Sequence, residues 1–142
     1  MSFDLKIVDN DLDLNTDGTI QTVRDNTKLI QDILKPILTE QGENPFHRWY
    51  GGVLALRIIG NILDAHQGAT EAERAIQDTL ATLVALQREQ ARVQYVSPGE
   101  TLATLKSIDV LRDTEDPRRW QIVVAVITRE LTVVETTFEL RL

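Results

Sequence analysis

The period of the hydrophobic pattern changes along this chain of 142 residues, and that change limits the folds it can adopt. In residues 26–41 and 71–92, apolar side chains recur at intervals of three and four, as on one face of an α-helix. From Trp120 onwards they recur at every second position, as in a β-strand. The pattern predicts an α+β fold in which helices pack on one face of a small, mostly antiparallel sheet.

Length and composition are typical of a single globular domain spanning residues 1–142. Hydrophobic residues make up 42% of the chain, which is enough for a core, and there is no cysteine for a disulfide or thiolate metal site. The net charge of −7 opposes nonspecific attraction to nucleic acid. Because the chain has neither a signal-peptide pattern nor an apolar run of about 20 residues, we expect no membrane partner and assembly in the cytoplasm.

Local signals set the expected limits of the helices. Asp25, Asn26 and Thr27 offer capping oxygens at the start of the first helix, and Gly42 suits a left-handed residue at its end. Residues 53–63 form a short helix in this interpretation, and residues 66–69 form a break. Thr70 and Glu73 then match a capping box that opens the helix over residues 71–92.

The last third of the chain predicts three extended segments. Residues 106–111 are extended, 113–119 form a polar hairpin loop, and 120–127 form a strand that is apolar on both faces. A shorter strand is expected at 93–96. The final strand, Leu131–Leu142, is predicted to be half exposed: Val134, Thr136, Phe138 and Leu140 share one face, and Thr137 belongs to the other.

The N-terminal segment predicts an acidic hairpin. Residues 3–8 alternate like a short strand, and Asp17-Gly18 is a strong turn signal. Asp13, Asn15 and Asp17 also match the first half of a calcium-binding loop. Because the position of the bidentate glutamate holds Arg24, we favour a turn with side-chain hydrogen bonds and predict no metal site.

A polar and aromatic turn follows the first helix. Four rings, those of Phe46, His47, Trp49 and Tyr50, crowd one loop beside Glu43 and Arg48. Rings gathered in a loop indicate either a lock on the fold or a surface that meets a partner. The candidate interaction or structural residues in this turn are Glu43, Arg48, Trp49, Tyr50 and Gly51. We predict that Glu43 and its neighbours hold the end of the first helix against the Tyr50-Gly51 turn.

A helix that ends in Gly-Glu, followed by a short aromatic turn and Tyr-Gly, resembles the baseplate wedge and sheath-initiator proteins of contractile phage tails. Related subunits occur in type VI secretion baseplates and tailocins. The residues that carry the resemblance are Gln31, Leu38, Thr39, Gly42, Glu43, Tyr50 and Gly51. It extends to the acidic hairpin at Leu14–Val23 and to the C-terminal strands. His47, Arg48 and Trp49 depart from the family, which usually has an acidic residue and a proline before the Tyr-Gly.

The resemblance implies a structural baseplate subunit in the virion tail, one that links the baseplate wedge to the first sheath ring by strand addition. It implies baseplate wedge proteins and the tail sheath protein as partners, with tube or hub proteins as further ones. The physical counterpart in this chain is the strand-rich segment 120–142, whose final strand leaves a ladder edge unpaired. The candidate interaction residues in that strand are Val134, Thr136, Thr137, Phe138 and Leu140.

Proteins that resemble this chain have also been labelled lysozyme-like, so a tail-associated peptidoglycan hydrolase is the alternative. Glu43 is its candidate acid, and Trp49 and Tyr50 are rings that stack on a sugar. The sequence identifies no carboxylate partner for Glu43, no zinc-ligand spacing and no nucleotide-binding motif. We therefore predict that the chain is not an enzyme and has no cofactor; a small regulatory adaptor is a third alternative.

Overall fold

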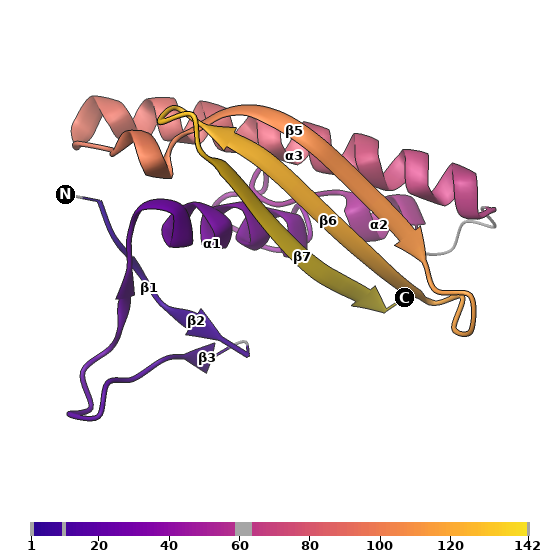
Figure 1. The fold of residues 1–142 in the computed structure, drawn as a ribbon, viewed down its shortest axis with the longest axis horizontal. Coiled ribbons are helices and arrows are strands. Elements are labelled where there is room, and N and C mark those ends of the chain that lie inside the picture. The colour runs from indigo at the N-terminus through magenta and orange to yellow at the C-terminus, as the bar shows by residue number, and fades with distance from the viewer. Residues whose placement is uncertain (1, 10, 59–63, 142) are drawn as a thin grey trace.

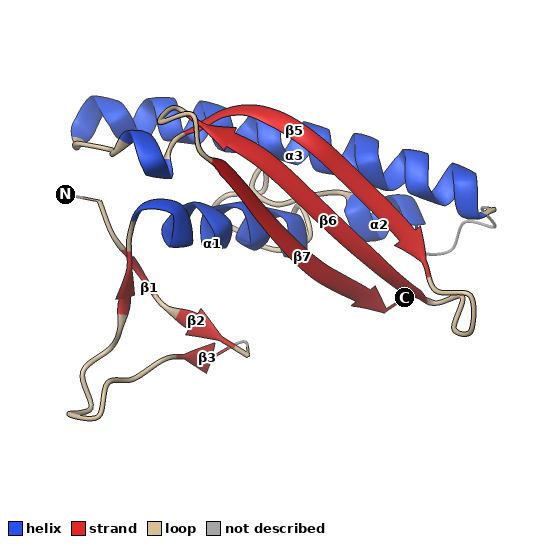
Figure 2. Cartoon of the chain, in the orientation of Figure 1, coloured by secondary structure: helices blue, strands red, loops and turns tan. Residues whose placement is uncertain are grey.

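A three-stranded antiparallel sheet with helices on one face forms the body of the protein (Figures 1 and 2). The computed structural model describes residues 2–9, 11–58 and 64–141. The sheet has the order β5-β6-β7, with β5 at Leu102–Arg112, β6 at Arg119–Thr128 and β7 at Val133–Arg141. The helices α1 (Asp25–Leu38), α2 (Leu54–Ile58) and α3 (Ala65–Val93) lie behind it. The predicted α+β class is confirmed.

The core lies between the helices and the inner face of the sheet. Helix α1 buries Leu29, Ile33 and Ile37, which lie on successive turns of the predicted apolar stripe. They meet apolar residues of the other elements: Ile76, Leu80, Leu83, Ile122, Val124, Val126, Val134 and Phe138. The apolar faces of the helices and of the sheet therefore share one core, as expected when the two layers pack together.

Helix α1 ends earlier than expected and is not capped as predicted. Its N-cap is Arg24, which makes no side-chain capping bond, and Asp25 instead accepts a hydrogen bond from Ser97 Oγ at 2.7 Å. Gly42 does have a left-handed φ of +93°, but it lies beyond the helix, which ends at Leu38. The left-handed residue belongs to the following turn and not to a helix cap.

Helix α3 starts before the predicted capping box, so the expected break at residues 66–69 is wrong. Asp64 is the N-cap, and its side chain accepts a hydrogen bond from Gln67 N at 2.7 Å. Thr70 is inside the helix and donates to His66 O. Gly68 is buried against the ring of Trp120, so close that an added Cβ would lie 2.5 Å from the ring. The glycine that suggested a break is a packing residue.

The connection from α3 to the sheet contains a 3-10 helix, η1 (Pro98–Glu100), and no strand at 93–96. Glu100 is buried and accepts a hydrogen bond from Ser97 N at 2.8 Å. Gln87, also buried, donates to Glu100 O and accepts from Leu102 N, both at 2.9 Å. These bonds fix the start of β5, which is longer than the predicted strand at 106–111.

The predicted hairpin is present near the N-terminus as four short strands. Strand β1 (Asp4–Leu5) pairs with β4 (Thr22–Val23), and β2 (Ile7–Val8) pairs with β3 (Asp11–Leu12). Figure 1 shows these strands extending away from the sheet. The predicted helix at 53–63 is α2 as far as Ile58; residues 59–63, and Leu142 of the final strand, lie outside the described residues. No described helix has the length and apolar content of a membrane span.

Candidate functional site

The turn after α1 is held by backbone contacts. Gly52 N donates to Thr39 O at 2.8 Å, and Gln41 N donates to Gly52 O at 2.9 Å. Gly51 has a left-handed φ of +105°, and a Cβ at this position would lie 2.6 Å from Thr39 O. The turn can fold back on the end of the helix only because residue 51 lacks a side chain.

The aromatic side chains of this turn differ in their exposure and in their contacts. Phe46 is 88% exposed and Trp49 is 51% exposed. Trp49 makes edge contacts with the rings of His47 and Tyr50, at centroid distances of 5.7 and 6.2 Å. Burial, together with the negative charges of Asp32 and Asp4, raises the pKa of Tyr50, which keeps its hydroxyl neutral. Tyr50 thus connects the exposed turn to a polar cleft.

The carboxylate of Glu43 makes no hydrogen bond or ion pair within the described part of the chain, and its side chain is exposed. Arg48 is also exposed. The sequence-based prediction that Glu43 locks the end of the first helix against the Tyr-Gly turn has no counterpart in these contacts. Gly51 and Gly52 supply that lock through the backbone.

A cleft of about 300 Å³ lies where the N-terminal segment, α1, α3 and Tyr50 meet. Two ion pairs line it, Lys28 with Asp32 and Lys35 with Asp4. Lys28 is only 4% exposed, although it carries a charge. A buried lysine is retained at a cost unless it is paired, so the aspartate opposite it is needed for the local fold.

The two aspartates of this cleft have pKa values displaced in opposite directions. Burial raises the pKa of Asp32, and the hydrogen bond and charge of Lys28 offset only part of that effect. Burial also acts on Asp4, but hydrogen bonds from Lys35 and Gln31 outweigh it and lower its pKa. Two carboxyls with pKa values driven apart are the arrangement that acid–base pairs use. The sequence missed this pair because Asp4 and Asp32 are far apart in the chain and match no motif.

The C-terminal strand places its residues as the alternation predicted. Val134, Thr136 and Phe138 are buried and Leu140 is half buried, whereas Thr137 is exposed. The pairs Val126–Val134 through Trp120–Leu140 run in continuous register with β6. Among the described strands, β7 pairs with β6 alone, so its other side is an edge of the sheet.

The register also fixes which backbone groups of β7 point outward. Thr128 N donates to Thr132 O at 2.9 Å, so these two residues form a hydrogen-bonded pair. Bonded and non-bonded pairs alternate in an antiparallel ladder, and β6 and β7 pair without a bulge. The even-numbered residues of β7 therefore bond to β6, and Thr137, with the other odd-numbered residues, directs its N–H away from the sheet.

The opposite edge, β5, is less regular. Its register with β6 shifts twice, between Leu102 and Thr104 and between Leu105 and Ser107. Bulges on an edge strand twist it and disfavour pairing with another chain. Of the two edges, β7 is therefore the better template for an added strand.

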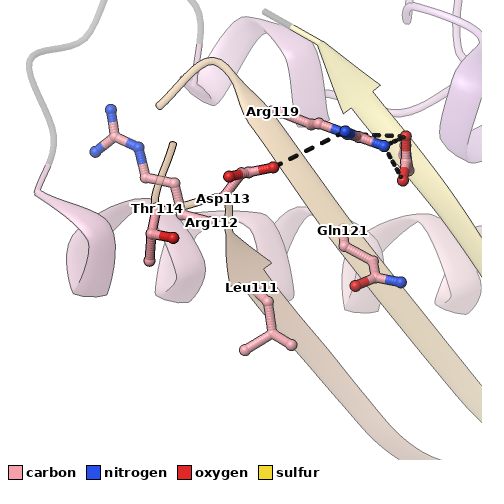
Figure 3. Close-up of a pocket in the computed structure, with 7 residues that line it drawn as sticks. Leu111, Arg112, Asp113, Thr114, Arg119 and Gln121 are labelled. Carbon is pink, nitrogen blue, oxygen red and sulfur yellow. Dashed lines mark hydrogen bonds and ion pairs between the residues drawn. The ribbon is translucent and has the colours of Figure 1, made fainter. Parts of the chain in front are cut away.

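A polar pocket of about 370 Å³ lies at the far end of the β5–β6 hairpin (Figure 3). Arg119 extends across it to Glu139 on β7, with N–O distances of 2.8 to 3.1 Å, and lies 3.9 Å from Asp113. Backbone N–H groups of Glu115 and Asp116 lower the pKa of Asp113. The carboxylates of Asp113 and Glu139 act as acceptors that tie the hairpin to β7.

The acidic turn of the N-terminal hairpin uses its side chains internally. The Asp17 carboxylate accepts hydrogen bonds from Thr19 N at 3.0 Å and Thr19 Oγ1 at 2.7 Å, and Asn15 Nδ2 donates to Thr19 Oγ1 at 2.9 Å. Asp13 pairs with Lys6 at 2.7 Å. Among the described residues, no group of three or more histidine, aspartate or glutamate side chains has the arrangement of a metal site.

Comparison with known proteins identifies the fold. No protein family and no curated protein sequence matches the chain. A crystal structure of a "putative tail lysozyme" from Geobacter sulfurreducens matches with a TM-score of 0.59 and 14% sequence identity, over 82% of this chain and 89% of that one. At this identity the likeness shows a shared fold, here one known from a tail-related protein.

This comparison corrects one prediction from the sequence. The chain was expected not to be an enzyme, yet the protein that shares its fold is named a lysozyme. A hydrolase is therefore a candidate function for this fold, and it is considered below with the cleft that contains Asp4 and Asp32.

Proposed function

We propose that this protein is a tail-associated subunit of a contractile phage or a related injection system, and that β7 receives a strand from a neighbouring subunit. The observation that carries the proposal is the regular edge of β7, whose odd-numbered residues direct backbone groups outward. An added strand gains main-chain hydrogen bonds there without needing a large apolar patch. The fold shared with a tail protein supports the same setting.

In this proposal the subunit belongs to the tail baseplate and joins the baseplate wedge to the first sheath ring. Its partners are baseplate wedge proteins and the tail sheath protein, with tube or hub proteins nearby. Glu135, Glu139 and Arg141 are exposed on the outer face of β7. Charges on an edge strand disfavour indiscriminate pairing, so the free subunit stays unpaired until the correct strand arrives.

A proline at position 137 tests the proposal, since it removes an outward N–H without touching the ladder with β6. We expect Thr137→Pro to leave a folded subunit that enters the baseplate but starts no sheath. Thr137→Val keeps the N–H and is the matched control; Thr136→Pro removes a bond to β6 and should unfold the sheet edge. Circular dichroism and counts of sheathed tails are the measurements. Normal numbers of sheathed tails with folded Thr137→Pro would rule out strand addition at β7.

The second candidate is a tail-associated peptidoglycan hydrolase, and the comparison supports it more directly than it supports sheath initiation. The cleft supplies the two carboxyls that glycoside hydrolysis uses, one with a raised pKa and one with a lowered pKa. In this role Asp32, whose pKa burial raises, is the candidate acid, and Asp4, whose pKa is lowered, is the candidate carboxylate. Tyr50 and Phe3 line the same cleft and offer faces to a sugar ring.

Clearing of a cell-wall suspension tests this second candidate. If the cleft is the active site, Asp4→Asn abolishes clearing while the circular dichroism spectrum stays native, and Asp32→Asn abolishes it as well but also weakens the local fold by leaving the buried Lys28 without its partner. Asp17→Asn, in the exposed hairpin turn, is the matched control and should clear at the wild-type rate. Loss of clearing in Glu43→Gln instead would assign the acid to the aromatic turn.

A further inference from the structure

The N-terminal arm, residues 3–22, exposes its large apolar side chains on the surface. Seven large apolar side chains in it are between 39% and 55% exposed: Phe3, Leu5, Ile7, Val8, Leu12, Leu14 and Ile20. Of the described residues of the arm, none is buried. Contiguous apolar residues on a projecting segment mark an interaction site more often than an ordinary surface.

The apolar residues are organised in pairs across the strands. Ile7 lies opposite Leu12, and Leu14 lies opposite Ile20. Between these two pairs, Lys6 forms an ion pair with Asp13 and donates to Gln21 Oε1 at 3.1 Å. The arm thus presents two apolar ridges with a polar junction between them. A two-stranded ribbon of this kind has little stability in water unless something covers it.

The root of the arm is fixed to α1, so its direction is set by the body of the protein. Gln31 donates to Leu5 O at 2.7 Å and accepts from Ile7 N at 3.0 Å. Lys35 forms an ion pair with Asp4. Figure 1 shows the strands beyond this root lying apart from the sheet and α3. An anchored and projecting ribbon presents its ridges to a partner at low entropic cost.

The negative charge of the arm indicates the chemistry of the partner surface. The arm contains five aspartates and one lysine. Asp4 and Asp13 pair with lysines, whereas Asp9, Asp11 and Asp17 have no cationic partner within the described residues. Complementary charge lowers the cost of approach and selects among apolar surfaces. The arm matches an apolar groove with a rim of lysine and arginine.

We propose that the N-terminal arm is a docking element for a second protein whose apolar groove is bordered by basic side chains. The proposal is separate from strand addition at β7, because it concerns different residues and needs no free strand edge. A second copy of this chain is a poor occupant, since each copy carries a net charge of −7. An anionic lipid surface repels the arm for the same reason.

The test uses the full chain and a defined probe, a short fluorescent peptide that alternates leucine and lysine. We expect it to bind, to protect the amides of residues 3–22 from hydrogen exchange, and to bind more weakly in high salt. The double variants Ile7→Thr with Leu12→Thr and Leu14→Thr with Ile20→Thr should each weaken binding by about tenfold or more. These side chains are exposed and threonine suits a strand, so the variants should keep the native circular dichroism spectrum.

Three controls separate this proposal from its rivals. Val93→Thr changes an exposed apolar residue at the end of α3 and should bind like wild type. A matched peptide that alternates leucine and glutamate should not bind. Thr137→Pro should leave the affinity for the leucine–lysine peptide unchanged, so failure of strand addition does not remove the arm proposal.

Several results would overturn the proposal. Equal binding of the acidic peptide would show that charge selects nothing, and full binding by both arm variants would place the site elsewhere. Self-association that the arm variants abolish would make a second copy the occupant. Binding to vesicles rich in phosphatidylserine, lost in the same variants, would make it a membrane surface.

Discussion

At the scale of single residues, glycines determine more of this structure than the charged residues that the sequence brought forward. Glu43 was the expected lock of the turn after α1, but its carboxylate is exposed and has no bonded partner among the described residues. Gly51 allows the turn because its left-handed φ and its contact with Thr39 O both exclude a side chain. A glycine in the sequence indicates that a left-handed φ or a close backbone contact is possible there, but it does not identify the backbone atom that lies opposite.

We predict that Gly51→Ala lowers the free energy of unfolding by roughly 1–3 kcal/mol, because a left-handed alanine is strained and its Cβ meets Thr39 O. Gly42→Ala is the matched control: its φ is also left-handed, but a Cβ there has nothing within 4 Å. Urea unfolding of both variants separates backbone strain from the close contact. Equal losses in the two variants would mean that the contact with Thr39 contributes nothing.

Asp4 gives a prediction for pH. Its pKa in the folded protein lies below the ordinary value of 3.8, since Lys35 and Gln31 stabilise the ionised form. A group whose pKa is lowered by folding stabilises the protein at pH values above its pKa in the unfolded chain. That stability is lost as the pH falls through its pKa in the folded protein. Asp4→Asn should therefore be less stable than wild type at neutral pH, and the difference should shrink as the pH falls below 3.8. Unfolding curves at a series of pH values measure it; a difference that stays constant into acid would contradict the assignment.

At the scale of elements, the sequence predicted the period correctly and several boundaries incorrectly. The stripe through Ile76, Leu80 and Leu83 is buried as expected, because a long amphipathic pattern outweighs local variation. The start of α3 was misplaced because Thr70 and Glu73 fit a capping box while Asp64 performs the capping. Which of two acceptable caps is used depends on tertiary packing, here the contact of Gly68 with Trp120.

That contact predicts the effect of Gly68→Ala. Alanine favours a helix over glycine by about 1 kcal/mol, but the added Cβ would lie 2.5 Å from the Trp120 ring. We expect overpacking to dominate, with a net loss of roughly 1–3 kcal/mol in the free energy of unfolding. A double-mutant cycle with Trp120→Phe measures the coupling, since the smaller ring leaves room. A stabilised Gly68→Ala would show that the ring moves aside without cost.

Among the candidate sites, the edge strand was predictable from the sequence, whereas its outward backbone groups and the cleft were not. The edge strand was predictable, because alternation over Val133–Arg141 describes a half-exposed strand wherever it lies. The parity of its outward N–H groups was not, since it depends on the pairing of Thr128 with Thr132. The cleft of Asp4 and Asp32 was also not predictable, because folding alone brings the N-terminal segment beside α1.

At the scale of the whole molecule, stability is expected to be uneven. The helices and the sheet share one core, in which Ile122, Val124 and Val126 are fully buried. The N-terminal arm has no described buried residue and is held at its root by Gln31 and Lys35. Regions with few buried apolar contacts open locally at a lower free energy than the core. The protein therefore combines a stable body with an arm whose order depends on its root and on what it binds.

Hydrogen exchange measured residue by residue tests this division. Amides of Val124 and Val126 in the central strand should exchange only through global unfolding, so their protection should fall steeply with added denaturant. The amides of Lys6 and Asp13 in the arm donate to Gln21 O and Lys6 O, but they should exchange by local opening, with protection that barely depends on denaturant. Gln31→Ala removes the bonds that hold Leu5 and Ile7 and should lower protection in the arm while leaving β6 unchanged. If the arm amides instead share the denaturant dependence of β6, the arm folds as one unit with the core, and its exposed apolar ridges are stabilised by the body of the protein without a partner.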